Sequence, residues 1–172
     1  MSGLATSIIT SDATAVAAGA VIGALSRYQL GEAASAYIPK DTMRAGLQGW
    51  HTAGINIAGS FVLGGLAGTP TFSRPPATAT AAISPSTSIS KAPSLQGLSP
   101  RAKLMLGVGF CGSFTTFSTF SVDVAKWITE GQIGKAGGYV LANNVGGIMA
   151  AAAGMVLMKK VFVAPAQLKK AK

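Results

Sequence analysis

Residues 109–121 read GFCGSFTTFSTFS, a run of glycine, hydroxyl and aromatic residues with no charge. They follow the apolar residues 104–108 and lie in a segment long enough to cross a bilayer. Leucine and isoleucine insert into lipid more favourably than glycine, serine and threonine do. The composition of this run therefore indicates a task other than filling the bilayer.

The composition of the whole chain is that of a one-domain integral membrane protein. Of its 172 residues, 49% are hydrophobic and 11% are charged, and the mean hydropathy is +0.45. The 14 Lys and Arg residues outnumber the 5 Asp and Glu residues. Most of them flank hydrophobic runs, where lipid headgroups interact with them, and they form no basic helix face with interleaved aromatics. This pattern predicts contact with membrane lipid and no nucleic-acid partner.

Four segments are long enough to span about 30 Å of hydrocarbon as helices. The sequence predicts an all-α membrane protein with four transmembrane helices at about 13–31, 47–68, 104–128 and 136–158. The first two contain glycine pairs one helical turn apart, Gly19 with Gly23 and Gly64 with Gly68. Such pairs allow a second helix to approach closely, so we expect helix contacts at both.

Two segments are predicted to lie outside these helices. Residues 69–100 are rich in Pro, Ser, Thr and Ala, and they offer too little apolar surface to offset the entropy of ordering them, which predicts a disordered loop. Residues 159–172 begin with two lysines and form a basic tail. We expect this tail to lie in or near the lipid headgroups.

The sequence lacks the groups that most catalytic sites need. His51 is the sole histidine, Cys111 is the sole cysteine, and none of the five acidic residues falls at the middle of a predicted span. A metal cluster, a nucleophile with its base and a proton-coupled carboxylate all require such groups. We therefore expect that the protein is not an enzyme.

Neutral hydrogen-bond donors and phenyl rings remain inside the predicted helices. Asn56, Asn143 and Asn144 face the protein interior or a pore, because an unpaired amide is costly in lipid. These amides either hydrogen-bond between helices or direct N–H groups at an anion. Phe117 and Phe120 lie three residues apart and share a helix face. Their rings either pack together or turn their positive edges toward a small anion.

The middle of the third predicted helix contains residues that tolerate a break. Gly112, Ser113, Thr115 and Thr116 are glycine or hydroxyl residues. A break would free backbone carbonyl groups, which suit a small hard cation such as Na⁺. Ordinary helix packing through small residues is the alternative, and the spacing does not decide between the two.

The run at 109–121 resembles the signature of the Fluc (CrcB) fluoride channel family. Three further matches occur in the family's order, and the resemblance therefore covers all four predicted spans. They are residues 23–28 (GALSRY) in the first helix, Thr52, Asn56, Gly59 and Phe61 in the second, and Tyr139, Asn143 and Gly147 in the fourth.

The resemblance implies a passive, fluoride-selective ion channel that exports cytoplasmic fluoride. In this family two four-helix subunits form an antiparallel dimer with two pores and a central structural Na⁺. The matching positions place Phe117 and Phe120 in contact with fluoride and Asn56 in the pathway. Backbone carbonyls at the break of the third helix, those of Gly112 and Thr115, would bind the Na⁺.

The resemblance also implies further pathway residues. Thr52 lies one helical turn before Asn56, and Thr116 belongs to the motif of the third helix. Arg27 corresponds to an arginine near the pore vestibule, where its charge would attract anions from solution. Tyr139 and Asn143 would continue the polar track along the fourth helix.

Basic residues are distributed unequally between the two sides of the predicted topology. The side with both termini and the long loop carries nine, and the other side carries four, Lys40, Arg44, Lys126 and Lys135. This bias predicts cytoplasmic termini. An antiparallel homodimer needs the same chain to insert in both orientations, which the bias opposes. The partner is therefore one of two chains. It is either a second copy, if the charges of the loop and tail have little influence on the orientation of insertion, or a related chain with the opposite charge bias.

Two functions other than a channel remain open from the residues alone. A proton-coupled exporter of four small helices would need an acidic residue within the membrane, and Glu32 lies only at a helix end. A membrane scaffold without transport activity would need only the small-residue faces. Under every alternative the chain is a multi-pass membrane protein, and the sequence leaves the plasma or inner membrane and an organellar membrane all possible.

Overall fold

The computed structural model describes residues 12–37, 49–71 and 97–170, and side chains up to residue 162. Within these ranges all regular secondary structure is helical, apart from one isolated β-bridge between Thr71 and Leu98. The predicted all-α class is confirmed. The first two helices are α2 (Asp12–Tyr37) and α4 (Trp50–Gly68). The predicted start of the second helix at 47 falls outside the described residues, as does most of the predicted loop, residues 72–96.

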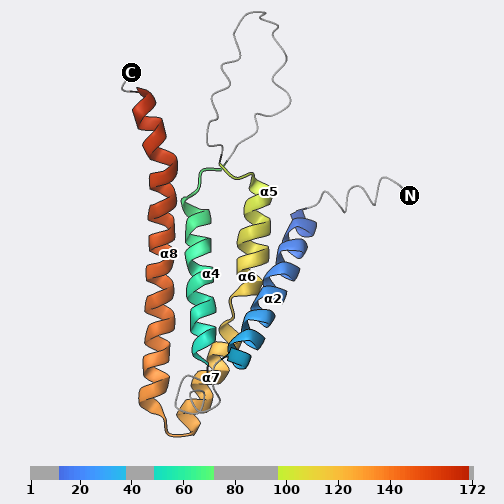
Figure 1. Ribbon diagram of the computed structural model, residues 1–172, viewed down its shortest axis with the longest axis vertical. Helices are drawn as coiled ribbons and strands as arrows, with labels where there is room; N and C mark the ends of the chain where they lie inside the picture. The colour runs from blue at the N-terminus through green and yellow to red at the C-terminus, as the bar shows by residue number, and fades with distance from the viewer. Residues whose placement is uncertain (1–11, 38–48, 72–96, 171–172) are drawn as a thin grey trace, which may run out of the picture.

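Residues 109–121 lie in a helical run that is interrupted near its middle. Ser99 caps its start by accepting a hydrogen bond from the Ala102 N–H. Three short helices then follow without a gap, α5 (Pro100–Lys103), the π-helix η2 (Leu104–Cys111) and α6 (Gly112–Phe114). Thr115 and Thr116 are extended, and α7 (Phe117–Thr129) begins after them. Figure 1 shows α7 continuing beyond this point toward the lower end of the molecule.

The last helix, α8 (Ile133–Lys170), extends past the predicted end at residue 158. Its backbone is helical through the segment 159–170 that the sequence assigned to a basic tail. Residues 159–164 contain neither glycine nor proline, and lysine is a good helix former. Lys159 and Lys160 therefore interrupt the apolar sequence without ending the helix.

Glycine lets the helices touch through their backbones. A Cβ atom at Gly19 or Gly23 of α2 would collide with the backbone of Met105 or Phe110. In the same way, Gly64 and Gly68 of α4 lie against the backbone of α8. The predicted close contacts at both glycine pairs are confirmed. They pair α2 with the 104–111 stretch and α4 with α8, the neighbours seen in Figure 1.

Two helical stretches are long and apolar enough to cross a membrane, Pro100–Thr129 and Ile133–Phe162. Large apolar side chains also remain exposed on α2 and α8, for example Val21 at 59% and Ile148 at 69% of their surface. Water is a poor solvent for such continuous apolar faces, whereas lipid or another helix suits them. The outer surface of the described chain therefore fits a bilayer.

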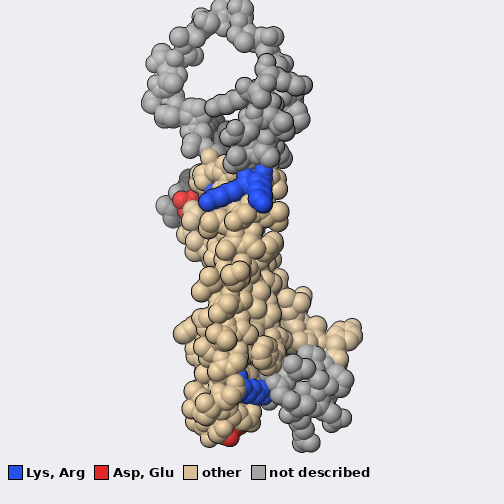
Figure 2. Space-filling model, turned by 90° about the vertical axis from the view of Figure 1, so that its left-hand side faces the viewer, with Lys and Arg blue, Asp and Glu red and all other residues tan. Residues whose placement is uncertain are grey.

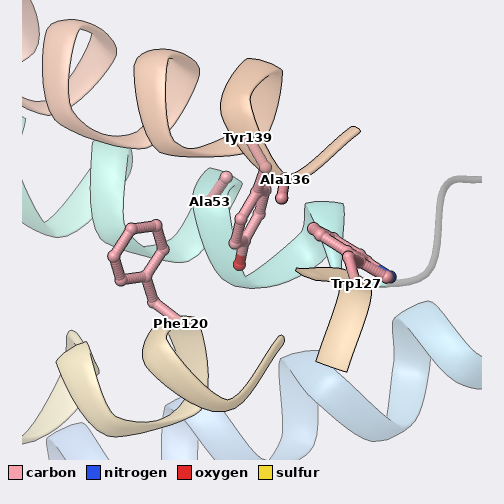
Figure 3. Close-up of a cluster of buried hydrophobic side chains, with 5 residues drawn as sticks. All are labelled: Ala53, Phe120, Trp127, Ala136 and Tyr139. Carbon is pink, nitrogen blue, oxygen red and sulfur yellow. The ribbon is translucent and has the colours of Figure 1, made fainter. Parts of the chain in front are cut away.

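The buried hydrophobic cluster lies at the lower end of the molecule, where α4, α7 and α8 meet. It consists of Ala53, Phe120, Trp127, Ala136 and Tyr139 (Figure 3). The Tyr139 ring lies between the other two aromatic rings, with centroid distances of 5.3 Å to Phe120 and 4.9 Å to Trp127. Such tilted and edge-on pairs stabilise beyond the area they bury. The cluster fixes the angle between α7 and its two neighbours.

Candidate functional site

A reciprocal pair of hydrogen bonds joins α4 to the helix break. The backbone N–H of Thr116 donates to Asn56 Oδ1 at 2.8 Å, and Asn56 Nδ2 donates to the Thr116 carbonyl at 3.1 Å. Both main-chain groups of an extended residue are thus satisfied by one amide side chain. Unpaired, these groups would each be costly in an apolar surrounding. Asn56 therefore stabilises the break between α6 and α7.

The same amide orients a second one on α8. The other N–H of Asn56 Nδ2 donates to Asn143 Oδ1 at 3.1 Å. Because the Thr116 pair fixes which atom of Asn56 is the donor, Asn143 must present its oxygen here and turn its NH₂ group elsewhere. The first alternative, hydrogen bonding between helices, is confirmed for Asn56. Asn56 hydrogen-bonds between helices, while the NH₂ group of Asn143 keeps its donors, with no acceptor among the described residues.

These groups line a hollow of about 370 Å³ beside the break. Its walls come from α4, from the break with the first residue of α7, and from α8. None of the lining side chains is charged, and several bear amide or hydroxyl groups. The lining residues are Asn56, Gly59, Ser60, Leu63, Thr115, Thr116, Phe117, Asn143, Asn144, Gly147, Ile148 and Ala151.

The two phenylalanines after the break have different surroundings. Their ring centroids are 5.6 Å apart, which confirms that the spacing brings them together on one side of α7. The Phe117 ring is 76% exposed and lines the hollow. Phe120 is only 6% exposed, and its ring packs on Tyr139. The Phe117 ring is therefore open to a small ligand, whereas the Phe120 ring is buried between Phe117 and Tyr139.

A second hollow of about 360 Å³ lies on the other side of Thr116. Arg27 and Glu32 of α2 and Thr52 of α4 contribute to its walls. Among the described residues, Arg27 has no ion-pair partner, so its charge is available to an anion. Thr116 lines both hollows and so separates a charged space from an uncharged one.

Comparison with known proteins identifies the family. The model of the CrcB-like proteins (Camphor Resistance, CrcB) matches residues 14–155. The chain belongs to the CrcB family. Three relatives, each named fluoride-specific ion channel FluC, match over most of both chains. They come from Rhodospirillum centenum (34% identity, 79% of this chain, 88% of the relative), Hyphomonas neptunium (32%, 86%, 94%) and Stutzerimonas stutzeri (33%, 86%, 96%).

Membership of the CrcB family agrees with the apolar helices, and the chain is an integral membrane protein. The family model covers α2, α4, the interrupted run and most of α8. Both hollows lie within the matched residues. The described residues contain no group of three or more His, Cys, Asp or Glu side chains that could bind a metal ion. The three relatives are named as ion channels and not as enzymes.

Tyr139 and Thr52 differ from the other predicted pathway residues in this CrcB chain. Tyr139 is completely buried, and its hydroxyl donates to the Gly49 carbonyl at 3.1 Å, with Asp123 Oδ2 at 3.4 Å. Tyr139 lines neither of the two hollows. Thr52 is 2% exposed and borders the hollow of Arg27. On α8, the polar residues that line the first hollow are Asn143 and Asn144.

The break also changes the hydrogen bonding of Gly112. In an uninterrupted α-helix the Gly112 carbonyl would accept from the N–H of Thr116, which here donates to Asn56 instead. Thr115 closes the last turn of α6 through its N–H and hydroxyl, both of which donate to Cys111. Gly112 lies at the exposed surface of the chain. Carbonyl oxygens at such a point are ligands of the kind that Na⁺ prefers.

Sequence reasoning did not single out Ser60, which lines the first hollow, or Thr119, which lines the second. Asn144, which it placed at the interior or a pore, lines the first hollow. Ser60 lies four residues after Asn56, so helical spacing on α4 could have identified it. Thr119 accepts a hydrogen bond from the Thr116 hydroxyl at 3.0 Å while its N–H donates to the same oxygen. That contact forms the cap of α7 and depends on where the helix begins, which composition alone does not fix.

Proposed function

We propose that this CrcB-family chain forms a passive, fluoride-selective channel that exports cytoplasmic fluoride. The observation that carries the proposal is the position of Thr116, which lines both hollows. A continuous polar route would run from the hollow of Arg27, past Thr116, into the hollow of Asn143 and Phe117. The name shared by the three relatives, fluoride-specific ion channel, supports the choice of ion.

The uncharged lining of the first hollow suits a strongly hydrated anion that must also leave. Fluoride gives up water only where hydrogen-bond donors replace it, and the NH₂ group of Asn143 supplies two. The positive edge of the exposed Phe117 ring adds a weak attraction. A fixed cation at this point would bind the ion too tightly for rapid conduction. Arg27, in the outer hollow, would attract anions to the entrance without trapping them inside.

Export of fluoride protects the cell because of the chemistry of hydrofluoric acid. Neutral HF crosses a bilayer, dissociates at the near-neutral pH of the cytoplasm, and leaves the anion trapped there. A passive pore lets the anion leave down its electrochemical gradient. Coupling to protons would favour an acidic side chain in the uncharged first hollow, and none lines it. The one acidic residue that lines the second hollow, Glu32, lies in the wall that also contains Arg27. The proposal therefore includes no energy source.

The site is incomplete in one chain, and we propose that an antiparallel partner completes it. Phe117 and the hollow beside it are open to the surface. A second chain packed on this face in the inverted orientation would enclose two such routes as two pores. The carbonyl oxygens of Gly112 and Thr115 from both chains would then give four oxygen ligands for one structural Na⁺ at the centre.

Flux measurements in liposomes test the function. Purified protein is reconstituted into liposomes that contain fluoride. A cation ionophore is then added, so that no membrane potential builds up against the flow of fluoride, and efflux is followed with a fluoride electrode. We expect rapid fluoride efflux that does not depend on a pH gradient, and no chloride efflux under the same conditions. Equal chloride efflux, or efflux that requires a pH gradient, would refute a passive fluoride-selective channel.

Accessibility of introduced cysteines tests the antiparallel partner. Lys160→Cys and Gln132→Cys lie near opposite ends of α8 and are exposed. The native Cys111 is only 1% exposed and should contribute little background. An impermeant thiol reagent added to intact cells should label both variants if the chain inserts in both orientations. Labelling of one variant alone would exclude the homodimer and identify a related, inverted chain as the partner.

A further inference from the structure

A third hollow, of about 350 Å³, lies between α4 and α8 at the end of the bundle opposite the aromatic cluster. Its walls are almost entirely apolar and include Phe61, Leu66 and Met158. Gly65 contributes no side chain to the groove, and Gly154 packs directly on the backbone of Phe61 and Gly65. Phe162, at the far end of the apolar span Ile133–Phe162, also lines it. The groove therefore lies where the bilayer core meets the headgroups.

The ammonium group of Lys103 lies beside one of the residues that line this groove. Lys103 Nζ donates to the carbonyl of Thr69, and Thr69 is itself one of the lining residues. An ammonium group has three N–H donors, so two remain after this bond, and no acceptor for them occurs among the described residues. The Thr69 N–H and hydroxyl close the end of α4 by donating to Leu66 and Gly65, and the Thr69 carbonyl accepts from Lys103. This single bond leaves two of the three N–H donors of Lys103 unused.

Further basic residues gather at the same end of the molecule. Lys159 and Lys160 follow Met158 on α8 and are exposed. Arg101 lies two residues before Lys103, and its ion pair with Asp12 is long, at 3.4 Å, and exposed. Figure 2 shows Lys and Arg side chains gathered just below the grey residues at the upper end of this face, above a long uncharged surface. An apolar groove thus opens toward a positive patch.

We propose that this groove binds one acyl chain of an anionic phospholipid, with the phosphate at Lys103. The apolar walls accept the hydrocarbon, and the two free N–H groups of Lys103 donate to phosphate oxygens. Lys159 and Lys160 add attraction for a negative headgroup. The proposal requires only that the chain lies in a bilayer. A chain that binds this lipid but transports no fluoride would refute the proposed function and leave the lipid site intact.

Native mass spectrometry of the detergent-purified protein tests the site. Phosphatidylglycerol and phosphatidylcholine with identical acyl chains serve as the probes. We expect the anionic lipid to bind at least about fivefold more tightly, the factor that one basic residue near a membrane surface contributes. Lys103→Gln should lower this preference about fivefold, whereas Lys103→Arg, which keeps the charge, should retain it. Equal binding of the two lipids by the native chain would overturn the proposal.

A second pair of variants tests the groove itself. Gly65→Leu fills it with a side chain, since a Cβ there would lie 3.3 Å from Met158 Cγ, a flexible neighbour that can move. We expect this variant to lose both lipids. Gly137→Leu, at an exposed glycine of α8 with open space around it, is the matched control and should bind both normally. Unchanged lipid binding by Gly65→Leu, or a lower dimer fraction as its only effect, would overturn the proposal.

Discussion

Phe117 and Phe120 are one helical turn apart on α7, yet they belong to two different regions of the molecule. Phe120 belongs to the buried hydrophobic cluster around Tyr139, and the Tyr139 side chain is completely buried there. Phe117 borders the polar hollow around Asn56 and Asn143 and is 76% exposed. The side chains of the cluster pack on one another, whereas the hollow contains the NH₂ group of Asn143, for which the described residues offer no acceptor.

The difference shows how a break in a helix can be kept at a defined place. The cluster fixes α7 below the break, and Asn56 satisfies the backbone of Thr116 at the break itself. Both regions use residues of α4, α7 and α8, but one provides rigidity and the other an open polar surface. We therefore expect changes in the cluster to reduce stability and changes in the hollow to reduce ion flux.

Tyr139→Ala should have the largest effect on stability. It removes a completely buried aromatic side chain from the cluster, and such changes cost about 3–5 kcal/mol of the free energy of unfolding. The fraction of folded protein during titration with SDS in mixed micelles would measure it. Leu141→Ala, at a 65% exposed position of the same helix, should cost less than about 1 kcal/mol. Equal losses in the two variants would show that the cluster is not the stabilising core.

Asn56→Ala should have the next largest effect and should affect both properties. It leaves the N–H and C=O of Thr116 without partners, at a cost of about 2 kcal/mol. It also frees the Asn143 amide to rotate, so fluoride flux should fall together with stability. Asn56→Asp keeps an acceptor for the Thr116 N–H but places a buried carboxylate against the Thr116 carbonyl and Asn143 Oδ1, so it should be at least as destabilising as Asn56→Ala. Wild-type stability of Asn56→Ala in the same titration would contradict the role assigned to this amide.

The sequence predicted the helix contacts and several residues of the hollow. It did not predict which side chains belong to the buried cluster and which line the hollow. Glycine spacing predicted the close contacts of α2 and α4, because a helical turn places such residues on one face. Asn56 and Phe117 were predicted as site residues from their chemistry and from the family resemblance. The burial of Tyr139 depends on Gly49 and Asp123, which are distant in sequence, and no local pattern encodes that contact.

Phe117→Ala should reverse the pattern of Tyr139→Ala. An exposed ring contributes little to folding, so the free energy of unfolding should change by about 0.5 kcal/mol or less. If the ring edge stabilises the passing ion, fluoride flux in liposomes should fall at least about tenfold, equivalent to about 1.4 kcal/mol of barrier. Val122→Ala, at a 67% exposed site on α7, serves as the control. Normal flux through Phe117→Ala would remove the ring from the proposed pathway.

Tyr139→Phe should have the smallest effect and separates the two regions most sharply. The ring stays in the cluster, and the Gly49 carbonyl keeps a partner, because it also accepts from the Thr52 N–H at 2.9 Å. Loss of one hydroxyl hydrogen bond should therefore cost about 1 kcal/mol. Fluoride flux should stay within about twofold of wild type, because the hydroxyl lines neither hollow. If instead the hydroxyl lies in the pathway, as the family resemblance implies, flux should fall about tenfold with stability nearly unchanged, and the boundary between cluster and hollow would move to include Tyr139.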